Sequence, residues 1–448
     1  MNGKQLVLQA IRHETVERVP WVPYTGVHIG SLKGYRADEL LNSEEMLLEC
    51  LLASNAAYTP DGQPLLFDLQ LEAEILGCGL KWDGKAPPSV VEHPLAGSEE
   101  IDLPIPKKSD GRLPMVFRVA ERFRKAVGEH TAIFGLFCGP LTLASHLRGT
   151  RFFLDFKRNE SYAHRLVDFA TTVAQRMAEY YIEAGMDVIA VVDPLISQIS
   201  PKYFTEFFTE PYTRLFEHIR GREAPSSFFV CGDATKNVEV MCQTRPDAIA
   251  IDENIDIIEA KKITDRYNIT ISGNIPLTAV MLLGNQQDNQ KCAIDLIDAL
   301  GKHNFILAPG CDIPYAVPEQ NVIGVGQAVQ NVEQTRAFLT NYVREEIDLP
   351  VEMPDYEHLE RPLVEVFTID SLTCAACTYM KASAFDMKDV FGDKVDIVER
   401  KSAELETIVR MNRLGVKNLP AILINGKVRY SSIIPDREVL KAELESML

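Results

Sequence analysis

The stretch YAHRLVDFATTVAQRMAEYYIEAGMDVIAVVDP, residues 162–194, carries a local pattern that recurs along most of the chain. Over residues 162–184 the apolar side chains are spaced three and four apart, which is typical of an amphipathic helix. The short apolar run VIAVV at 188–192 reads as a strand, and Asp193-Pro194 ends it. A helix that leads directly into a strand is one unit of an α/β protein with a parallel sheet.

The same alternation runs from about residue 15 to residue 330, and it includes a second clear helical pattern at 203–219. Eight strands that alternate with helices favour closure into a (β/α)₈ barrel, the TIM-barrel fold. The predicted strands are residues 18–24, 65–69, 132–137, 188–192, 227–231, 248–251, 270–272 and 305–308.

The composition changes near residue 345, where an acidic stretch punctuated by Pro350 and Pro354 predicts a linker. We therefore divide the chain into a barrel at 1–344, a linker at 345–361 and a small α/β domain at 362–448. In the small domain we expect strands at 363–368 and 395–399, helices at 374–390 and 403–414, and a hairpin of 421–424 with 427–430 around Asn425-Gly426.

The charge and composition exclude several classes of protein. The 448 residues carry a formal net charge of −18, which argues against nucleic acid or an anionic membrane as the main partner. No apolar run is long enough to span a bilayer, and residues 1–12 do not resemble a signal peptide. Nine scattered cysteines fit a reducing compartment, so we expect a cytoplasmic protein.

Cys374-Ala375-Ala376-Cys377 follows a predicted strand and opens a predicted helix. A helix N-terminus stabilises a thiolate, so this pair is expected to be redox-active. Residues 362–448 resemble the thioredoxin and glutaredoxin-like family, in which a cis-proline packs beside the CxxC pair. Pro420 matches that proline, whereas the Ala-Ala centre departs from the family's usual residues.

Chemistry in a (β/α)₈ barrel collects where the strands end. Cysteines occupy three such ends, as Cys138, Cys231 and Cys311, and Asp193 and Asp252 end two further strands. One strand-end cysteine would be an ordinary buried residue, but three together favour a functional site. We assign Cys50, Cys78, Cys242 and Cys292 to structural positions.

Several motifs in the barrel resemble the uroporphyrinogen decarboxylase superfamily: Arg18-Val19-Pro20, Gly139-Pro140-Leu141-Thr142-Leu143-Ala144, and Gly273-Asn274-Ile275-Pro276. True decarboxylases of that superfamily carry an arginine-rich loop after the first strand. Here the loop, residues 24–30, contains no arginine. Phe67-Asp68, residues 72–78 and Gly310-Cys311-Asp312-Ile313-Pro314 instead resemble the corrinoid-dependent methyltransferase branch.

That resemblance implies a zinc ion held by a histidine and two cysteines, which activates an acceptor thiol. Cys231 and Cys311 match the two cysteines, but Phe229 stands at the histidine position. Cys138 is the preferred third ligand. The other donors considered are His28, Glu74 and Asp193, and a further alternative is that zinc binding has been lost.

The sequence therefore predicts a methyltransferase that moves a methyl group from a methylated corrinoid to a small acceptor, with a thiol preferred. Glu74, Asp193 and Asp252 would orient the acceptor. No cobalamin-binding Asp-x-His-x-x-Gly motif occurs, so the corrinoid (cobalamin) would arrive on a partner protein or as a free cofactor. The CxxC domain would keep the barrel cysteines reduced. The alternatives are a tetrapyrrole decarboxylase and a metal-free thiol–disulfide protein.

Overall fold

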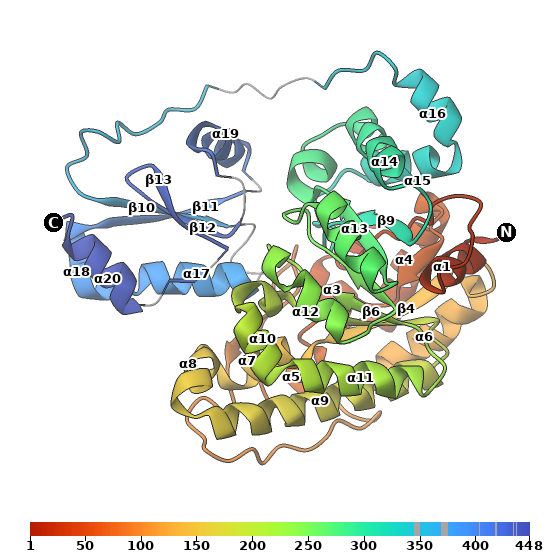
Figure 1. The fold of residues 1–448 in the computed structure, drawn as a ribbon, viewed down its shortest axis with the longest axis horizontal. Coiled ribbons are helices and arrows are strands. Elements are labelled where there is room, and N and C mark those ends of the chain that lie inside the picture. Colours follow the sequence, from red (N-terminus) through yellow and green to blue (C-terminus); the bar gives the residue numbers. More distant parts are fainter. Residues whose placement is uncertain (345–349, 369–374, 403, 417–418, 433, 436) are drawn as a thin grey trace. The chain divides into compact units, whose positions relative to one another are not determined.

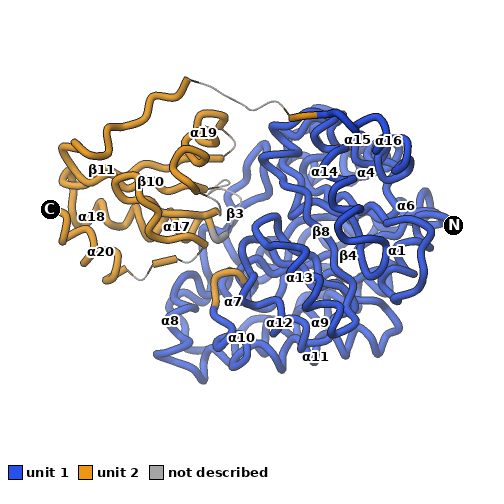
Figure 2. The backbone as a smooth tube through the Cα atoms, turned by 45° about the horizontal axis from the view of Figure 1, so that its top comes forward, with its two compact units in different colours: residues 1–196, 200–342 blue, residues 197–199, 343–448 orange. Residues whose placement is uncertain are grey.

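A computed structural model describes residues 1–344, 350–368, 375–402, 404–416, 419–432, 434–435 and 437–448. The chain divides into two compact units (Figure 2). Residues 1–196 and 200–342 make the first unit, and residues 197–199 and 343–448 make the second.

The first unit is built on a curled sheet of parallel strands with helices around it (Figure 1). The sheet order follows the chain, β1-β4-β5-β6-β7-β8-β9, so each strand pairs with the next one along the sequence. The strands are β1 (Gly62–Pro64), β4 (Ala132–Cys138), β5 (Val188–Val192), β6 (Ser226–Phe229), β7 (Ala248–Ala250), β8 (Thr270–Ile275) and β9 (Phe305–Pro309). The predicted parallel α/β architecture is confirmed.

Both faces of these strands are buried, because one face lines the interior of the curl and the other lies against helices. Alternate residues of each strand enter one apolar core, as Phe134 and Leu136 do in β4 and Ala248 and Ala250 do in β7. Their neighbours on the opposite face, such as Ile133 and Phe137, are also fully buried. This double burial explains why the strands appear in the sequence as continuous apolar runs.

Helices make the crossover connections that successive parallel strands require. They are α6 (Leu113–Val127), α7 (Pro140–Arg148), α8 (Arg151–Arg158), α9 (Glu160–Glu183), α10 (Pro201–Phe207), α11 (Thr209–Arg220), α12 (Val238–Gln243), α13 (Ile257–Arg266), α14 (Gln286–Leu300), α15 (Glu319–Gln330) and α16 (Val332–Phe338). Within the described ranges, none of the helices has the length and apolar character required to cross a bilayer.

The predicted helix at 203–219 is two helices, α10 and α11, separated at Phe208. Pro211 gives the physical reason, because proline lacks the N–H that would bond to the carbonyl of Phe207 and its ring collides with that carbonyl. The helix predicted at 162–184 is observed as α9.

The first predicted strand, 18–24, forms a single bridge pair between Trp21 and Leu307. Its backbone nevertheless contacts both edges of the sheet. The Val22 amide donates to the Leu307 carbonyl of β9 at 3.0 Å, and the Asp61 amide beside β1 donates to the Trp21 carbonyl at 2.9 Å. This segment therefore links the two edge strands.

The second predicted strand was wrong by three residues, since β1 lies at Gly62–Pro64 and not at 65–69. The polar Gln63 at the centre of this strand does not fit an apolar pattern, so the sequence analysis did not identify it. In the structure Gln63 is buried, and its amide donates to the Leu51 carbonyl at 3.2 Å and to the Ser54 hydroxyl at 2.8 Å. Both acceptors belong to helix α4 (Glu44–Tyr58), so hydrogen bonds to a helix offset the cost of removing the polar Gln63 side chain from water. The local sequence pattern gives no sign of this contact.

Three short helical turns, η1 (Pro194–Gln198), η2 (Thr235–Asn237) and η3 (Leu277–Leu282), lie among these strands and helices, and the other elements lie before α6. They are α1 (Gly3–Ile11), α2 (His28–Ser31), α3 (Ala37–Leu41), α4 (Glu44–Tyr58), α5 (Leu71–Ile75) and an antiparallel pair, β2 (Gly79–Lys81) with β3 (Ser89–Glu92).

The second unit contains a mixed sheet of order β11-β10-β12-β13. Strand β10 is parallel to β11 and antiparallel to β12, and β12 is antiparallel to β13. Its elements are β10 (Leu363–Thr368), α17 (Ala375–Phe385), α18 (Met387–Phe391), β11 (Asp396–Lys401), α19 (Leu405–Leu414), β12 (Ala421–Ile424), β13 (Lys427–Ser431) and α20 (Arg437–Glu445). The predicted order of strands and helices is reproduced among these described elements, except that the helix predicted at 374–390 is two helices, α17 and α18, and that α20 was not predicted.

A buried ion pair holds the Trp21 segment in place, and it gives the first prediction. The Asp61 carboxylate, whose side chain is 4% exposed, accepts from both Arg18 Nη atoms at 2.6 and 2.7 Å and from the Trp21 amide at 2.8 Å. Replacing Asp61 with Asn removes the counter-charge of Arg18, whose side chain is 26% exposed and still donates to the Val19 carbonyl. We therefore expect a loss of about 2 kcal/mol in the free energy of unfolding, measured by urea titration.

The matched control is Asp298→Asn, which breaks an exposed pair with Arg336. We expect it to cost less than about 1 kcal/mol, because exposed ion pairs contribute little. Equal losses in the two variants would show that the Asp61 pair does not anchor the segment.

Candidate functional site

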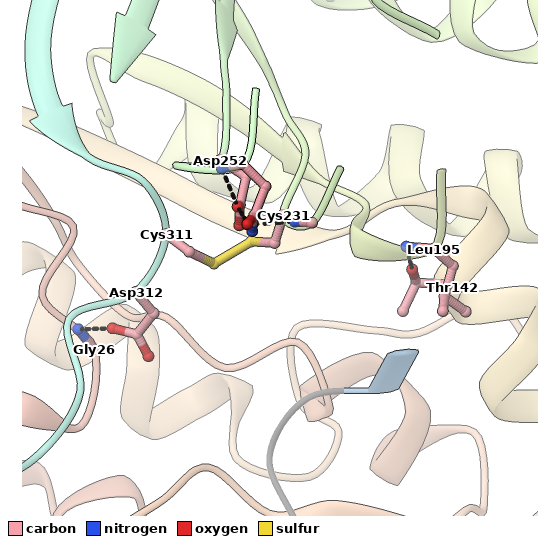
Figure 3. The surroundings of a disulfide bond; sticks show 9 residues. Gly26, Thr142, Leu195, Cys231, Asp252, Cys311 and Asp312 are labelled. Atoms are coloured by element: carbon pink, nitrogen blue, oxygen red, sulfur yellow. Dashed lines mark hydrogen bonds between the residues drawn. A yellow bond between two sulfur atoms is a disulfide. The ribbon is translucent and has the colours of Figure 1, made fainter. Parts of the chain in front are cut away.

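All strands of the parallel sheet end on one side, which we call the carboxyl edge. Cys231 follows β6 and Cys311 follows β9, and the structure joins them in a disulfide with their Cα atoms 5.9 Å apart (Figure 3). Both residues are partly buried and pack against the interior core of the sheet. Two of the three cysteines predicted to act together are thus adjacent.

Asp252 fixes the chain beside Cys231. Its side chain accepts from the Gly232 amide at 2.7 Å and from the Asn254 amide at 2.9 Å, and Figure 3 shows the carboxylate next to the Cys231 end of the disulfide. Gly232 has φ +83°, a conformation that other residues rarely adopt. Burial raises the pKa of Asp252, while these backbone hydrogen bonds oppose the rise.

Asp312 has the equivalent place beside Cys311. Its carboxylate accepts from the Gly26 amide at 2.7 Å and, in Figure 3, points toward Gly26. A side chain at position 26 would collide with this carboxylate, so glycine is required there. Loss of contact with water raises the pKa of Asp312 to about 8, and it raises the pKa of Glu253, which accepts from the Leu277 amide, to about 8.

Phe229, at the position where the resemblance expects a histidine, is an ordinary core residue here. It is fully buried, with its ring centroid 4.5 Å from that of Tyr24 and 5.8 Å from that of Phe67. These aromatic contacts fill the space with carbon, and a phenyl ring supplies no lone pair to a metal.

Cys138 ends β4 and is only 1% exposed. Burial raises the pKa of its thiol well above the ordinary value, and the carboxylates of Glu72 and Asp193 raise it further. Its sulfur lies 3.7 Å from the Gly139 carbonyl oxygen. In this structure Cys138 is a buried thiol with the acidic side chains of Glu72 and Asp193 near it.

These observations test the implied zinc site. In the form seen, Cys231 and Cys311 have no thiolate to offer because they are bonded to each other. The described residues contain no group of three His, Cys, Asp or Glu side chains that could hold a metal ion. The donor set therefore does not fit zinc.

Asp193, predicted to be catalytic, binds the first turn of helix α7 through its carboxylate. It accepts from the amides of Leu141 and Thr142 at 2.9 and 3.1 Å, from the Thr142 hydroxyl at 2.6 Å, and from the Tyr212 hydroxyl. Burial raises its pKa to about 6, and these hydrogen bonds counteract the rise. The contacts favour a positioning role, since both oxygens are occupied.

Glu74, the other predicted acid, lies on α5 with its side chain 31% exposed and bonds to Arg112 at 2.8 Å. It lines an open cavity of about 400 Å³ together with Asp38, Glu39, Asn42 and Trp82. Arg112 also bonds to Asp68 at 2.7 Å, so both carboxylates compensate a guanidinium that is 10% exposed.

The sequence analysis missed Glu72, two residues earlier on the same helix. Its side chain is buried, and no side-chain donor bonds to either carboxylate oxygen among the described residues. Backbone amides of Glu72 and Cys138 act on the carboxylate and lower its pKa, but burial outweighs them. Burial raises its pKa to about 8, and nearby Asp68 adds to the rise. Residues two apart on a helix point in different directions, so the Glu-Ala-Glu motif could have signalled one buried and one exposed acid.

His28, the alternative imidazole ligand, is buried in the protein and already bonded. Its Nε2 lies 2.7 Å from the Tyr58 hydroxyl and its Nδ1 lies 3.4 Å from the Tyr315 carbonyl oxygen. Burial lowers its pKa to about 4, so the ring is neutral at physiological pH. These contacts give His28 a structural role.

Of the predicted redox residues, Cys374 lies outside the described residues. Cys377 lies on α17 and is fully buried. The Leu419–Pro420 peptide bond is cis, as predicted for Pro420.

Comparison with known proteins gives a consistent assignment for the first unit. The uroporphyrinogen decarboxylase (URO-D) family matches residues 2–332. Methylcobamide:CoM methyltransferase MtbA from Methanosarcina acetivorans is 26% identical over 73% of this chain and 97% of its own length. Uroporphyrinogen decarboxylase from Nostoc punctiforme is 24% identical over 70% of this chain and 93% of its own length.

Among solved structures, a methyltransferase from Methanosarcina mazei covers 74% of this chain and 99% of its own, with a TM-score of 0.69 and 23% identity. At this identity the likeness concerns the fold.

The raised pKa of Glu72 predicts a specific pH dependence of stability. The folded protein keeps a proton on Glu72 up to about pH 8, whereas the unfolded chain loses it near the ordinary value, so this group's contribution to stability falls as the pH rises between those limits. We expect Glu72→Gln to be more stable than wild type at pH 8, by more than about 1 kcal/mol, and nearly equal to it below pH 5.

Thermal unfolding across this pH range measures the difference. Glu129→Gln, which changes a carboxylate that is 91% exposed, provides the control profile. A constant difference between Glu72→Gln and wild type at every pH would contradict the assignment of a buried, protonated carboxyl.

Proposed function

This chain belongs to the uroporphyrinogen decarboxylase (URO-D) family, and we propose that it transfers a methyl group from a methylated corrinoid to a thiol acceptor. The methylcobamide:CoM methyltransferases of Methanosarcina support this choice, because this chain matches them over nearly their whole length. A third such relative, MtaA from Methanosarcina barkeri, is 27% identical over 95% of its length.

The charge at the carboxyl edge is the observation that separates this proposal from a decarboxylase. A tetrapyrrole with several carboxylates needs positive side chains to hold it. Here Gly26 bonds to Asp312, His28 is neutral, and the groups beside the two cysteines are Asp252, Glu253 and Asp312. With pKa values of about 8, Glu253 and Asp312 are protonated at neutral pH, and none of these groups supplies a positive charge to a substrate carboxylate. The edge therefore favours a small substrate with few negative charges.

The proposed reaction conserves atoms and electrons. A thiolate attacks the methyl carbon, the cobalt–carbon bond breaks with both electrons left on cobalt, and the products are a methyl thioether and the reduced Co(I) corrinoid. Corrinoid and thiol are both substrates, and we propose that a partner protein carries the corrinoid. Because the donor set does not fit zinc, the proposal routes no step through a metal.

We propose positioning roles for the predicted acids. Asp252 holds the loop of Cys231 through Gly232, and Asp193 holds the start of α7 after Cys138. Glu74 borders the open cavity, where it can contact the acceptor. Asp193 and Asp252 follow strand ends at the carboxyl edge, where α/β proteins bind their ligands.

We also propose that residues 362–448 form a thioredoxin-like redox domain, joined to a (β/α)₈ barrel at 1–344 by the linker 345–361. The strand order β11-β10-β12-β13, with α17 directly after β10, supports this proposal. Cys374 and Cys377 would exchange disulfides with thiol substrates.

Methyl transfer can be tested with the full chain, reduced beforehand with a phosphine and incubated with methylcobalamin and 2-mercaptoethanesulfonate. We expect the absorbance of methylcobalamin to be replaced by that of the reduced corrinoid, and the methylated thiol to appear by mass spectrometry. Asp252→Asn should slow the reaction because it weakens the hold on Gly232, whereas Asp298→Asn, on the surface, should not.

Two outcomes would contradict the proposal. Decarboxylation of uroporphyrinogen without methyl transfer would identify the chain as a decarboxylase. Disulfide exchange without methyl transfer to any of several thiols would identify a redox protein.

The redox domain has its own test. We expect the full chain to catalyse reduction of a small disulfide by dithiothreitol, and Cys374→Ser/Cys377→Ser to lose this activity, because exchange needs both thiols of the pair. Cys292→Ser on α14 controls for the loss of an unrelated thiol. Unchanged catalysis in the double variant would exclude the CxxC pair as its source.

A further inference from the structure

The residues that hold Cys231 and Cys311 do not depend on the bond between them. Asp252 fixes Gly232, next to Cys231, and Asp312 fixes Gly26 from the position after Cys311. Neither contact involves a cysteine sulfur, so breaking the disulfide removes no atom from either of them. A pair held in this way can open and close again without rebuilding the loops.

The backbone near both cysteines is restricted. Gly232 has φ +83°, and a side chain at Gly310 would collide with the backbone of Glu253. The close packing at Gly310 holds this strand end against the loop of Glu253, and the two Cα atoms lie 5.9 Å apart, within the range that disulfides require. After reduction, the thiols would therefore remain close enough to bond again.

The disulfide crosses the carboxyl edge. It joins the ends of β6 and β9, which are separated in the sheet by β7 and β8. Both cysteines retain exposed surface, so a soluble reductant can reach them. Phe229 removes the ligand that would make the same cysteines a metal site.

We propose that Cys231 and Cys311 form a reversible dithiol–disulfide centre that takes a dithiol as its reductant and switches the activity of the carboxyl edge off when it is oxidised and on when it is reduced. One thiolate of the reductant attacks a sulfur of the pair, which breaks the Cys231–Cys311 bond and forms a mixed disulfide. The second reductant thiol then releases the remaining cysteine. Two electrons and two protons move to the pair, and the reductant leaves as a disulfide.

The switch rests on the proposed function in one respect: the reduced state is the one that transfers methyl groups. In the oxidised state the bond ties β6 to β9 at the edge where the substrates bind. Methyl transfer should therefore be lost on oxidation and recover on reduction.

Peptide mapping of the full chain tests the centre directly. The protein is equilibrated in mixtures of reduced and oxidised dithiothreitol, alkylated, digested and analysed by mass spectrometry. We expect the peptides of Cys231 and Cys311 to be linked at the oxidising end, alkylated at the reducing end, and to interconvert in both directions. In Cys231→Ser the Cys311 peptide should be alkylated throughout, and Cys292→Ser should behave like wild type.

Three results would overturn the centre: both thiols alkylated even at the oxidising end, a bond that does not re-form after reduction, or one zinc per reduced chain that protects both thiols from alkylation. Mapping of wild type decides the question even if a variant fails to fold. Equal rates of methyl transfer in the oxidised and reduced forms would overturn the switch. Reversible thiols without any methyl transfer would leave the centre standing and refute the proposed function.

Discussion

Hydrogen bonds between parallel strands run through the first unit from β1 to β9, so that every strand ends at the same edge. This one constraint brings residues that are far apart in the chain to one place. Cys231 and Cys311 are separated by 80 positions, yet their Cα atoms lie 5.9 Å apart because β6 and β9 end together. The Asp61–Arg18 pair secures the same arrangement by fixing the Trp21 segment between the two edge strands.

Buried carboxylates hold the loops at this edge by accepting hydrogen bonds from backbone N–H groups. Asp193 binds the first amides of α7, Asp252 binds Gly232, and Asp312 binds Gly26. Each bond satisfies a buried polar group and also fixes a loop at the end of a strand. Acids that appear catalytic in the sequence can therefore act by holding the loops that carry the reacting groups.

The carboxyl edge combines an acidic lining, a pair of bonded cysteines and an aromatic residue at the expected histidine position. Each of these features separates the chain from the arrangement that its family resemblance implied. They agree with one another, because a pair of cysteines that lacks a third ligand is free to bond to itself. The proposed methyl transfer and the proposed thiol switch both follow from this combination.

The sequence by itself determined the alternation of helices and strands, the strand ends at which Cys231 and Cys311 lie, and the order of elements after residue 362. These are local properties, because periodicity and chain breaks are encoded in neighbouring residues. Only the tertiary structure showed that Glu72 and not Glu74 is the buried acid, that Gln63 belongs to a strand, and that the two cysteines bond to each other. Those outcomes depend on contacts with distant parts of the chain, which supply the burial, the partners and the distances that no local pattern contains.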